Sequence, residues 1–174
     1  MTAPAVADAM SALRQTMANV AASVAVVTAD VGGSVHGVTI SSLISLSLDP
    51  PLILFALNRS SSMLGYLEES CFALTVLNAQ QREIAAALAR RDRPPVPTQW
   101  LTHVADACSH GVAVVRDGAA WVVARFERAC PVGDHVVVIG HVLRAAGSRM
   151  PPLVYHRRPY GSVMPAAASA VEAP

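Results

Sequence analysis

The sequence predicts a mainly antiparallel β-barrel with two or three peripheral helices. Three observations support this fold class. The apolar runs are mostly short and rich in β-branched residues, and turn residues rather than long helices separate them. In addition, 53% of the 174 residues are hydrophobic and only 14% are charged, which excludes a disordered chain. The length suits one domain, and an apolar surplus beyond one core suggests a subunit interface.

A helix and a β-hairpin are expected at the start of the chain. Residues 1–9 are mostly small and predict a flexible tail, whereas residues 10–19 place apolar side chains at helical spacing. The β-branched run 24–28 predicts a strand. Two consecutive glycines at 32–33 predict a hairpin turn into the next strand, 35–42.

The middle of the chain alternates buried strands with short helices. Continuous apolar runs predict strands over 52–57 and 72–77, and helices are expected over 62–69 and 80–90. Asn78, followed three residues later by a glutamine, resembles a capping box for the second of these helices.

A loop and four strands are expected in the last part of the chain. Residues 90–98 hold three arginines and three prolines and predict the loop. Asp117 and Gly118 predict a hairpin turn. One domain therefore covers 10–162, and 163–174 predict a second flexible tail. The four strands are expected over 112–116, 121–128, 135–143 and 153–156.

Charge and hydropathy exclude several classes of function. Thirteen basic residues face twelve acidic ones, and a net charge of +1 leaves no electrostatic footprint for nucleic acid. No apolar run reaches the roughly 20 residues that span a membrane. The N-terminal residues lack the basic start of a secretory signal. We therefore expect a cytoplasmic protein that binds neither nucleic acid nor membrane.

The cysteines predict no special chemistry. Cys71, Cys108 and Cys130 are odd in number and lack CxxC spacing, so neither a disulfide framework nor a zinc knuckle is expected. Cys71 heads an apolar run and is expected in the core. The set of His103, Cys108 and His110 matches no common zinc pattern, so no metal is expected.

Two polar segments are candidates for ligand binding. Serine is a poor strand former, yet serines crowd residues 36–47. Either a ligand with many polar groups or a solvated sheet face explains this cluster. At residues 58–62 (NRSSS), an amide, a guanidinium and three hydroxyls precede a helix and suit a phosphate. Ordinary helix capping explains one of these serines but not all three.

Two further segments carry imidazole and aromatic groups. His135 opens an apolar strand, where its ring can lie over the mouth of a cleft, although a purely structural histidine is the plainer alternative. Residues 153–161 (LVYHRRPYG) combine aromatic and basic side chains. This segment either closes a pocket or covers the barrel.

Three strings, taken in order, resemble one family. They are HGVTISSLISLSLDPPLILFALNRSSSM at 36–63, GDHVVVIGHV at 133–142 and PPLVYHRRPYG at 151–161, within a similarity over about 11–162. This pattern resembles the flavin reductase-like, FMN-binding split-barrel family. These are the short NAD(P)H:flavin oxidoreductases that supply reduced flavin to two-component monooxygenases. The resemblance implies a six-stranded Greek-key split β-barrel with peripheral helices, a homodimer and a partner monooxygenase.

The resemblance also implies roles for nine side chains. Six of them are expected to bind the flavin, and His135 is expected near the nicotinamide. The closing segment, with His156 and Tyr160, is expected to border the nicotinamide side, from its own or the partner subunit. The flavin set comprises Thr39, Ser41 and Ser42 along the ring and ribityl chain, and Asn58, Ser60 and Ser62 at the phosphate end.

FAD or FMN is the implied flavin, and NADH or NADPH the implied reductant. A hydride passes from nicotinamide C4 to flavin N5, so the cofactors carry the chemistry. The protein stacks the two rings, and no catalytic acid, base or nucleophile is expected. The alternative is a flavin-binding split-barrel protein that holds FMN as a prosthetic group, or carries it, without reducing free flavin.

Overall fold

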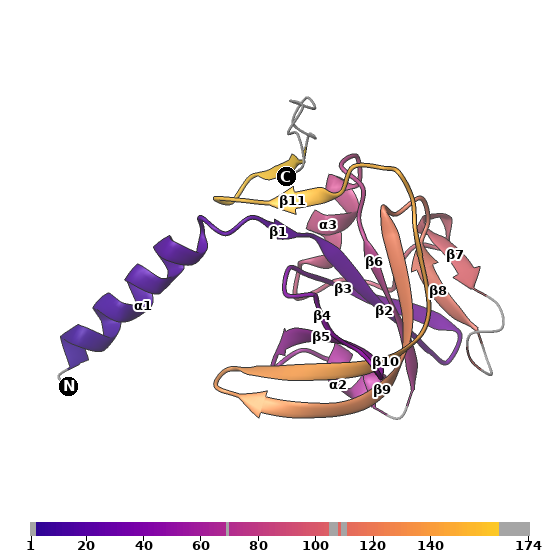
Figure 1. Ribbon diagram of the computed structural model, residues 1–174, viewed down its shortest axis with the longest axis horizontal. Coiled ribbons are helices and arrows are strands. Elements are labelled where there is room, and N and C mark those ends of the chain that lie inside the picture. The colour runs from indigo at the N-terminus through magenta and orange to yellow at the C-terminus, as the bar shows by residue number, and fades with distance from the viewer. Residues whose placement is uncertain (1–2, 69, 105–107, 109–110, 164–174) are drawn as a thin grey trace, which may run out of the picture.

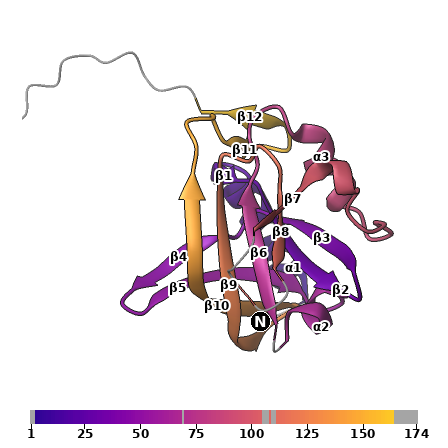
Figure 2. The ribbon, with the colours of Figure 1, turned by 90° about the vertical axis from the view of Figure 1, so that its right-hand side faces the viewer.

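The computed structural model describes residues 3–68, 70–104, 108 and 111–163, and far more of these residues lie in strands than in helices (Figure 1). The main sheet has the strand order β3-β2-β6-β9-β10-β5-β4, and every neighbouring pair is antiparallel. Figure 2 shows β6, β9 and β10 running side by side. The main sheet consists of β2 (Ala25–Val31), β3 (Ser34–Ile40), β4 (Ile44–Leu48), β5 (Pro51–Asn58), β6 (Cys71–Val76), β9 (Ala120–Val132) and β10 (His135–Gly147).

Shorter elements cover this sheet. Two small sheets contain β1-β11-β12 and β7-β8. The helix α1 extends away from the body of the molecule, whereas α3 lies beside the upper part of the barrel (Figure 1). The remaining elements, outside the main sheet, are β1 (Ala22–Ser23), β7 (Leu101–Val104), β8 (Val112–Val115), β11 (Leu153–Tyr155), β12 (Tyr160–Ser162), α1 (Ala3–Met17), α2 (Met63–Leu67), α3 (Arg82–Leu88) and the 3-10 helix η1 (Thr98–Trp100).

Strand β2 is buried on both faces, which explains its continuous apolar sequence. Side chains alternate across a strand. Ala25 and Val27 therefore point into the barrel interior, where Phe55 of β5 packs. Val26 points the other way, into a second apolar cluster beneath α3 that also contains Leu88. The segment after β3 is joined to β5 by two hydrogen bonds of the Ser42 hydroxyl, as described below.

Several boundaries differ from the sequence prediction. The first helix begins at Ala3, not at residue 10, because alanine favours helix over a tail. Strands β1, β4, β7 and β12 were not predicted. Gly32 and Gly33 form the predicted hairpin turn, with φ of 60° and 84°. Of the predicted C-terminal tail, residues 164–174 lie outside the described part of the chain.

The turn at Asp117 does not join a hairpin. Asp117 adopts a φ of 56°, which is common in turns. However, β8 pairs with β7, and β9 pairs with β6 and β10. The prediction of a hairpin at this point was therefore wrong. The turn dipeptide specifies a local reversal of the chain, whereas long-range packing selects the strand that pairs.

No disulfide framework was predicted, yet the described part of the structure contains one disulfide. Cys71 at the start of β6 and Cys108 between β7 and β8 form a disulfide across 37 residues. Cys130 is free and exposed. An odd count cannot show which two cysteines meet, because that depends on how β8 packs over β6.

Replacing Cys108 with serine is expected to lower the melting temperature by roughly 10 °C. The cross-link removes about 3–4 kcal/mol of chain entropy from the unfolded state, on the loop-closure estimate. Thermal unfolding without reductant measures the loss. The variant Cys130→Ser is the matched control, since Cys130 is unpaired. Equal melting temperatures for wild type and Cys108→Ser, or three titratable thiols in the native wild type, would contradict the bond.

Within the part of the chain that the structure describes, no helix is long and apolar enough to cross a membrane.

Candidate active site

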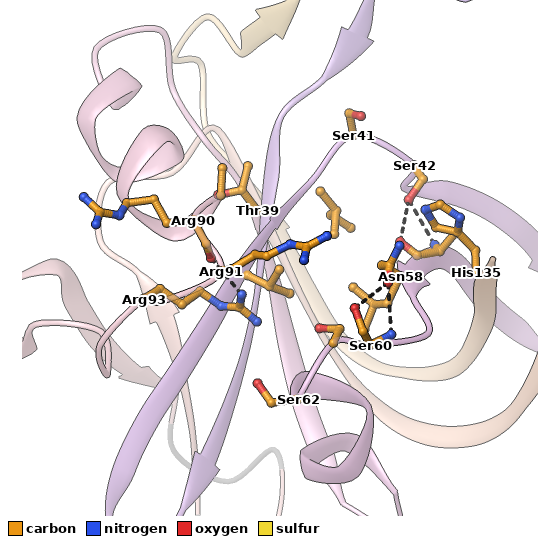
Figure 3. A pocket seen from close by; sticks show the side chains of 16 residues that line it. Thr39, Ser41, Ser42, Asn58, Ser60, Ser62, Arg90, Arg91, Arg93 and His135 are labelled. Carbon is orange, nitrogen blue, oxygen red and sulfur yellow. Dashed lines mark hydrogen bonds between the residues drawn. The ribbon is translucent and has the colours of Figure 1, made fainter. Parts of the chain in front are cut away.

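A pocket of 710 Å³ opens between β3, β5, the loop after α3 and the start of β10 (Figure 3). Backbone segments far apart in sequence therefore meet around one space. Seven of the nine predicted site residues lie on its wall. These are Thr39, Ser41, Ser42, Asn58, Ser60, Ser62 and His135.

Strand register brings the predicted phosphate junction and His135 together. Asn58, the last residue of β5, stands opposite His135, the first residue of β10. Arg59 fastens the same corner: its backbone N–H donates to the Asp134 carbonyl at 3.0 Å, and its Nη1 donates to the Gly133 carbonyl at 3.2 Å. The turn between β9 and β10 is thus held against residues 58–62.

Asn58 organises the junction. Its Oδ1 accepts hydrogen bonds from the Ser60 backbone N–H at 3.0 Å and the Ser60 hydroxyl at 2.7 Å. The Ser61 hydroxyl is buried and is the only such side-chain group without a hydrogen-bond partner in the described chain. Ser62 stands at the N-cap of α2, yet its side chain makes no capping bond. Capping therefore does not account for these serines.

Anion binding at the predicted site would depend on side chains more than on a helix dipole. Helix α2 spans only five residues, and the macrodipole of so short a helix is small. The hydroxyls of the junction and the guanidinium groups on the facing loop remain as the groups suited to a phosphate.

The polar segment after β3 is only partly free for a ligand. The Ser42 hydroxyl donates to the Ala56 carbonyl at 3.2 Å and accepts from the Ala56 N–H at 2.9 Å, so it ties this segment to β5. The Thr39 hydroxyl donates to the Ala85 carbonyl of α3 at 2.9 Å. Each oxygen has limited capacity left. Shape and backbone groups therefore matter here as much as hydroxyls.

The arginine loop folds back over β3. Arg93 Nε donates to the Gly37 carbonyl at 2.6 Å, and its Nη1 donates to the Arg90 carbonyl at 2.9 Å. Half-burial lowers the pKa of Arg93 from its usual value. Gly37 permits this approach: a Cβ there would lie 2.8 Å from Val96 Cγ2 and 3.2 Å from Leu88 Cδ1.

His135 is held by its neighbour. Its Nδ1 lies 2.7 Å from Asp134 Oδ1. The pKa of Asp134 lies below its usual range, because the carboxylate accepts this hydrogen bond and faces the imidazole charge. The bond orients the ring at the pocket wall.

The structure does not bring His156 and Tyr160 to this pocket. They belong to the β11–β12 hairpin, which lies at the opposite end of the molecule from α2 in both views (Figures 1 and 2). Tyr160 packs edge-on against Tyr155, with ring centroids 5.7 Å apart, and borders the cluster beneath α3. Burial is the main cause that raises the pKa of Tyr160, and the nearby Tyr155 raises it further. A nicotinamide role for these residues remains a prediction that requires a second subunit.

Ser61, Arg90, Arg91 and Arg93 line the pocket but were absent from the predicted site. Ser61 lies inside the segment 58–62 that the sequence predicted as an anion site, so its place in the pocket could have been predicted from its neighbours. The arginines were visible as a cluster in the loop, yet nothing local indicated that the loop returns to β3. Of the three residues weighed as a metal site, Cys108 is bound to Cys71, and His110 lies outside the described residues.

The flavin reductase-like domain model matches residues 17–164. The chain belongs to the flavin reductase-like family. The predicted family, the mainly β barrel fold and the activity class of NAD(P)H:flavin oxidoreductase are confirmed.

Three similar proteins illustrate the family. The NADH-dependent FMN reductase AsuE2 of Streptomyces nodosus subsp. asukaensis is 36% identical over 155 residues, 84% of this chain and 81% of that protein. The reductase component of 4-hydroxyphenylacetate 3-monooxygenase from Thermus thermophilus is 30% identical over 151 residues, which are 86% of this chain and 93% of that protein. The structure of BorF, the flavin reductase component of a bacterial two-component tryptophan halogenase, matches with a TM-score of 0.79 at 35% identity, over 88% and 98% of the two chains.

Proposed function

We propose that this flavin reductase uses NADH to reduce a diffusible flavin phosphate, FMN or FAD, and releases the product to a flavin-dependent monooxygenase or halogenase. The 710 Å³ pocket carries this proposal, because it joins a polar strand end, a hydroxyl-rich junction and three arginines. The relatives that act as reductase components support a partner oxygenase. A cytoplasmic location, where NADH is abundant, belongs to the same proposal.

The residues present suit a flavin phosphate. The Ser61 hydroxyl without a hydrogen-bond partner and the Ser62 side chain without a capping bond lie near Asn58, and the Arg91 side chain extends toward this side of the pocket (Figure 3). Thr39 and Ser41 edge the strand along which the ring and ribityl chain would lie. Apolar side chains of Val38 and Ile40 complete the wall. This mixture of apolar surface and a few polar groups is typical of a cofactor pocket.

When bound, the two cofactors supply the chemistry: a hydride leaves nicotinamide C4, bonds to flavin N5, and a solvent proton completes the reduced flavin. The chain orients the reactants and excludes water. His135, held by Asp134, acts as a positioning residue on the nicotinamide side. Because no group of the protein forms or breaks a bond, proximity accounts for the rate increase.

NADH oxidation at 340 nm, with FMN, FAD and riboflavin added in turn and repeated with NADPH, tests the proposal. We expect oxidation that rises and saturates with added flavin. Gel filtration then measures retained flavin. Stoichiometric flavin that survives dilution, together with no turnover of added flavin, would instead identify a prosthetic group or a carrier.

Replacing His135 with alanine is expected to raise the KM for NADH about tenfold and to change the KM for flavin less than twofold. The side chain contributes one hydrogen bond on the nicotinamide side, worth roughly 1–1.5 kcal/mol. Steady-state kinetics with each substrate varied in turn measures both values. The control is His103→Ala, whose side chain lies outside this pocket. Equal weakening for NADH and flavin would remove His135 from this role.

We also propose a homodimer that buries the exposed face of α1. Met10, Leu13 and Met17 lie on α1, Val20 follows shortly after its end, and all four are 51–61% exposed. Exposure of these apolar side chains to water is unfavourable. A second copy of the chain can cover them, and it is present in any solution of the protein. Light scattering is expected to give twice the chain mass, and Leu13→Glu to give monomers. A monomeric wild type would also remove the route by which Tyr160 reaches a nicotinamide.

A further inference from the structure

A second pocket, of 410 Å³, lies apart from the candidate active site. Its described lining shares no residue with the 710 Å³ pocket. The hairpin between β2 and β3, the segment that leads from α3 to β7, and the ends of β7 and β8 form its walls. Three titratable side chains, Asp30, His103 and Arg116, lie on these walls together with apolar ones.

The second pocket holds an acid and a base that do not neutralise one another. Asp30 Oδ1 accepts a hydrogen bond from the Gly33 N–H at 2.9 Å, and Arg116 Nη2 donates to the Leu101 carbonyl at 3.0 Å. Neither side chain forms an ion pair with any residue that the structure describes. Asp30 Oδ2 and the other guanidinium N–H groups of Arg116 are therefore available to a ligand.

The two charges lie toward opposite ends of the pocket. The Ala113 carbonyl of β8 accepts a hydrogen bond from the Thr28 hydroxyl of β2. Two residues later, β8 donates to Thr75 of β6, which pairs with β2 two residues before Thr28. Strands β2 and β8 therefore run in opposite directions. The end of β2 that carries Asp30 thus lies away from the end of β8 that precedes Arg116.

Apolar side chains line the stretch from one charge to the other. Val35 pairs with Asp30 across the β2–β3 hairpin. The Val96 N–H donates to the Val35 carbonyl at 2.7 Å, and Leu101 lies beside Arg116. Val35, Val96 and Leu101 belong to the buried cluster beneath α3, so close packing holds the floor of the pocket in place. An apolar floor with a few convergent polar groups is typical of a small-molecule site.

We propose that the second pocket binds a small zwitterion whose ammonium and carboxylate groups are separated by an apolar body. The ammonium lies at Asp30 and the carboxylate at Arg116, whose guanidinium can bind it through two hydrogen bonds. Linear ω-amino acids and short apolar dipeptides share this chemistry. The proposal is independent of the proposed reductase function, because the two pockets have no lining residue in common.

Isothermal titration calorimetry of the full chain with ε-aminocaproate tests the inference. We expect saturable binding that is about three- to fivefold tighter than for hexanoate or for hexylamine, since each of these analogues lacks one of two exposed ionic contacts. The dipeptide L-alanyl-L-leucine is titrated in parallel. A lower Kd for the dipeptide would assign the site to peptides, and a lower Kd for ε-aminocaproate would assign it to ω-amino acids.

Two variants assign each charge to its end of the ligand. Asp30→Asn keeps an oxygen that accepts the Gly33 N–H. In this variant ε-aminocaproate is expected to bind no more tightly than hexanoate but still more tightly than hexylamine. Arg116→Gln is expected to show the reverse pattern. The matched controls are Asp8→Asn on α1 and Arg82→Gln on α3, which are exposed and outside both pockets, and their Kd values are expected to equal those of wild type.

Three results would overturn the inference. The first is the absence of saturable binding of either zwitterion to wild type. The second is an equal Kd for ε-aminocaproate and both of its singly charged analogues, a comparison that needs only wild type and so does not depend on the folding of a variant. The third is an equal loss of affinity for all three compounds in Asp30→Asn or Arg116→Gln, because a general structural effect would produce that pattern.

Discussion

Replacement of Asn58 with alanine is expected to weaken FMN binding by roughly ten- to a hundredfold. The side-chain Oδ1 of Asn58 accepts two hydrogen bonds from Ser60, each worth about 0.5–1.5 kcal/mol. Without them the Ser60 N–H loses its partner and the junction no longer holds one shape. The side chain also lines the pocket opposite His135. Fluorescence titration of FMN measures the loss.

Two further variants sharpen this prediction. Asn58→Asp keeps an oxygen that accepts both hydrogen bonds but places a negative charge beside the phosphate. In this variant we expect FMN to bind as weakly as in Asn58→Ala, whereas riboflavin, which has no phosphate, binds as in wild type. Asn19→Ala is the control. Asn19 bonds to Arg157 far from the pocket, and no change in either Kd is expected. Normal FMN affinity in Asn58→Ala would show that the junction does not bind the flavin.

Gly37→Ala is expected to destabilise the protein by about 1–3 kcal/mol, the usual cost of an overpacked core, and to weaken FMN binding. The added methyl would lie 2.8 Å from Val96 Cγ2, so the loop must move away from β3. That movement stretches the bond between Arg93 and the Gly37 carbonyl and displaces the pocket wall. Denaturant unfolding and FMN titration measure the two effects.

The double variant Gly37→Ala with Val96→Ala separates this steric cause from others. Val96→Ala alone removes buried contacts and costs about 1–2 kcal/mol. In combination it also removes the obstructing methyl, so the double variant is expected to lose less stability than the two single losses added together, with a coupling of about 0.5–3 kcal/mol. Strict additivity would show that the alanine at position 37 acts by some other route.

The candidate site divides into parts that sequence reasoning reached and parts that it missed. Composition alone predicted the segment 58–62 as a phosphate site, because three hydroxyls, an amide and a guanidinium exceed what capping uses, and the structure places Asn58, Ser60, Ser61 and Ser62 on the wall of the pocket. Arg91 is visible in the sequence as part of an arginine-rich loop, but the sequence does not indicate where its side chain lies. Its placement depends on Gly37, which lets the loop pack on β3, and on Arg93, which fastens the loop there.

The sequence by itself determined the mainly β class, the hairpin at Gly32 and Gly33, and the family. These features depend on local backbone preferences and on ordered strings of residues that travel with the chain. Only the tertiary structure decided that Asn58 faces His135, that Cys71 meets Cys108, and that β8 pairs with β7 rather than β9. Such pairings join residues tens of positions apart, and the packing of the whole barrel, rather than any local preference, selects among the many partners that each strand could accept.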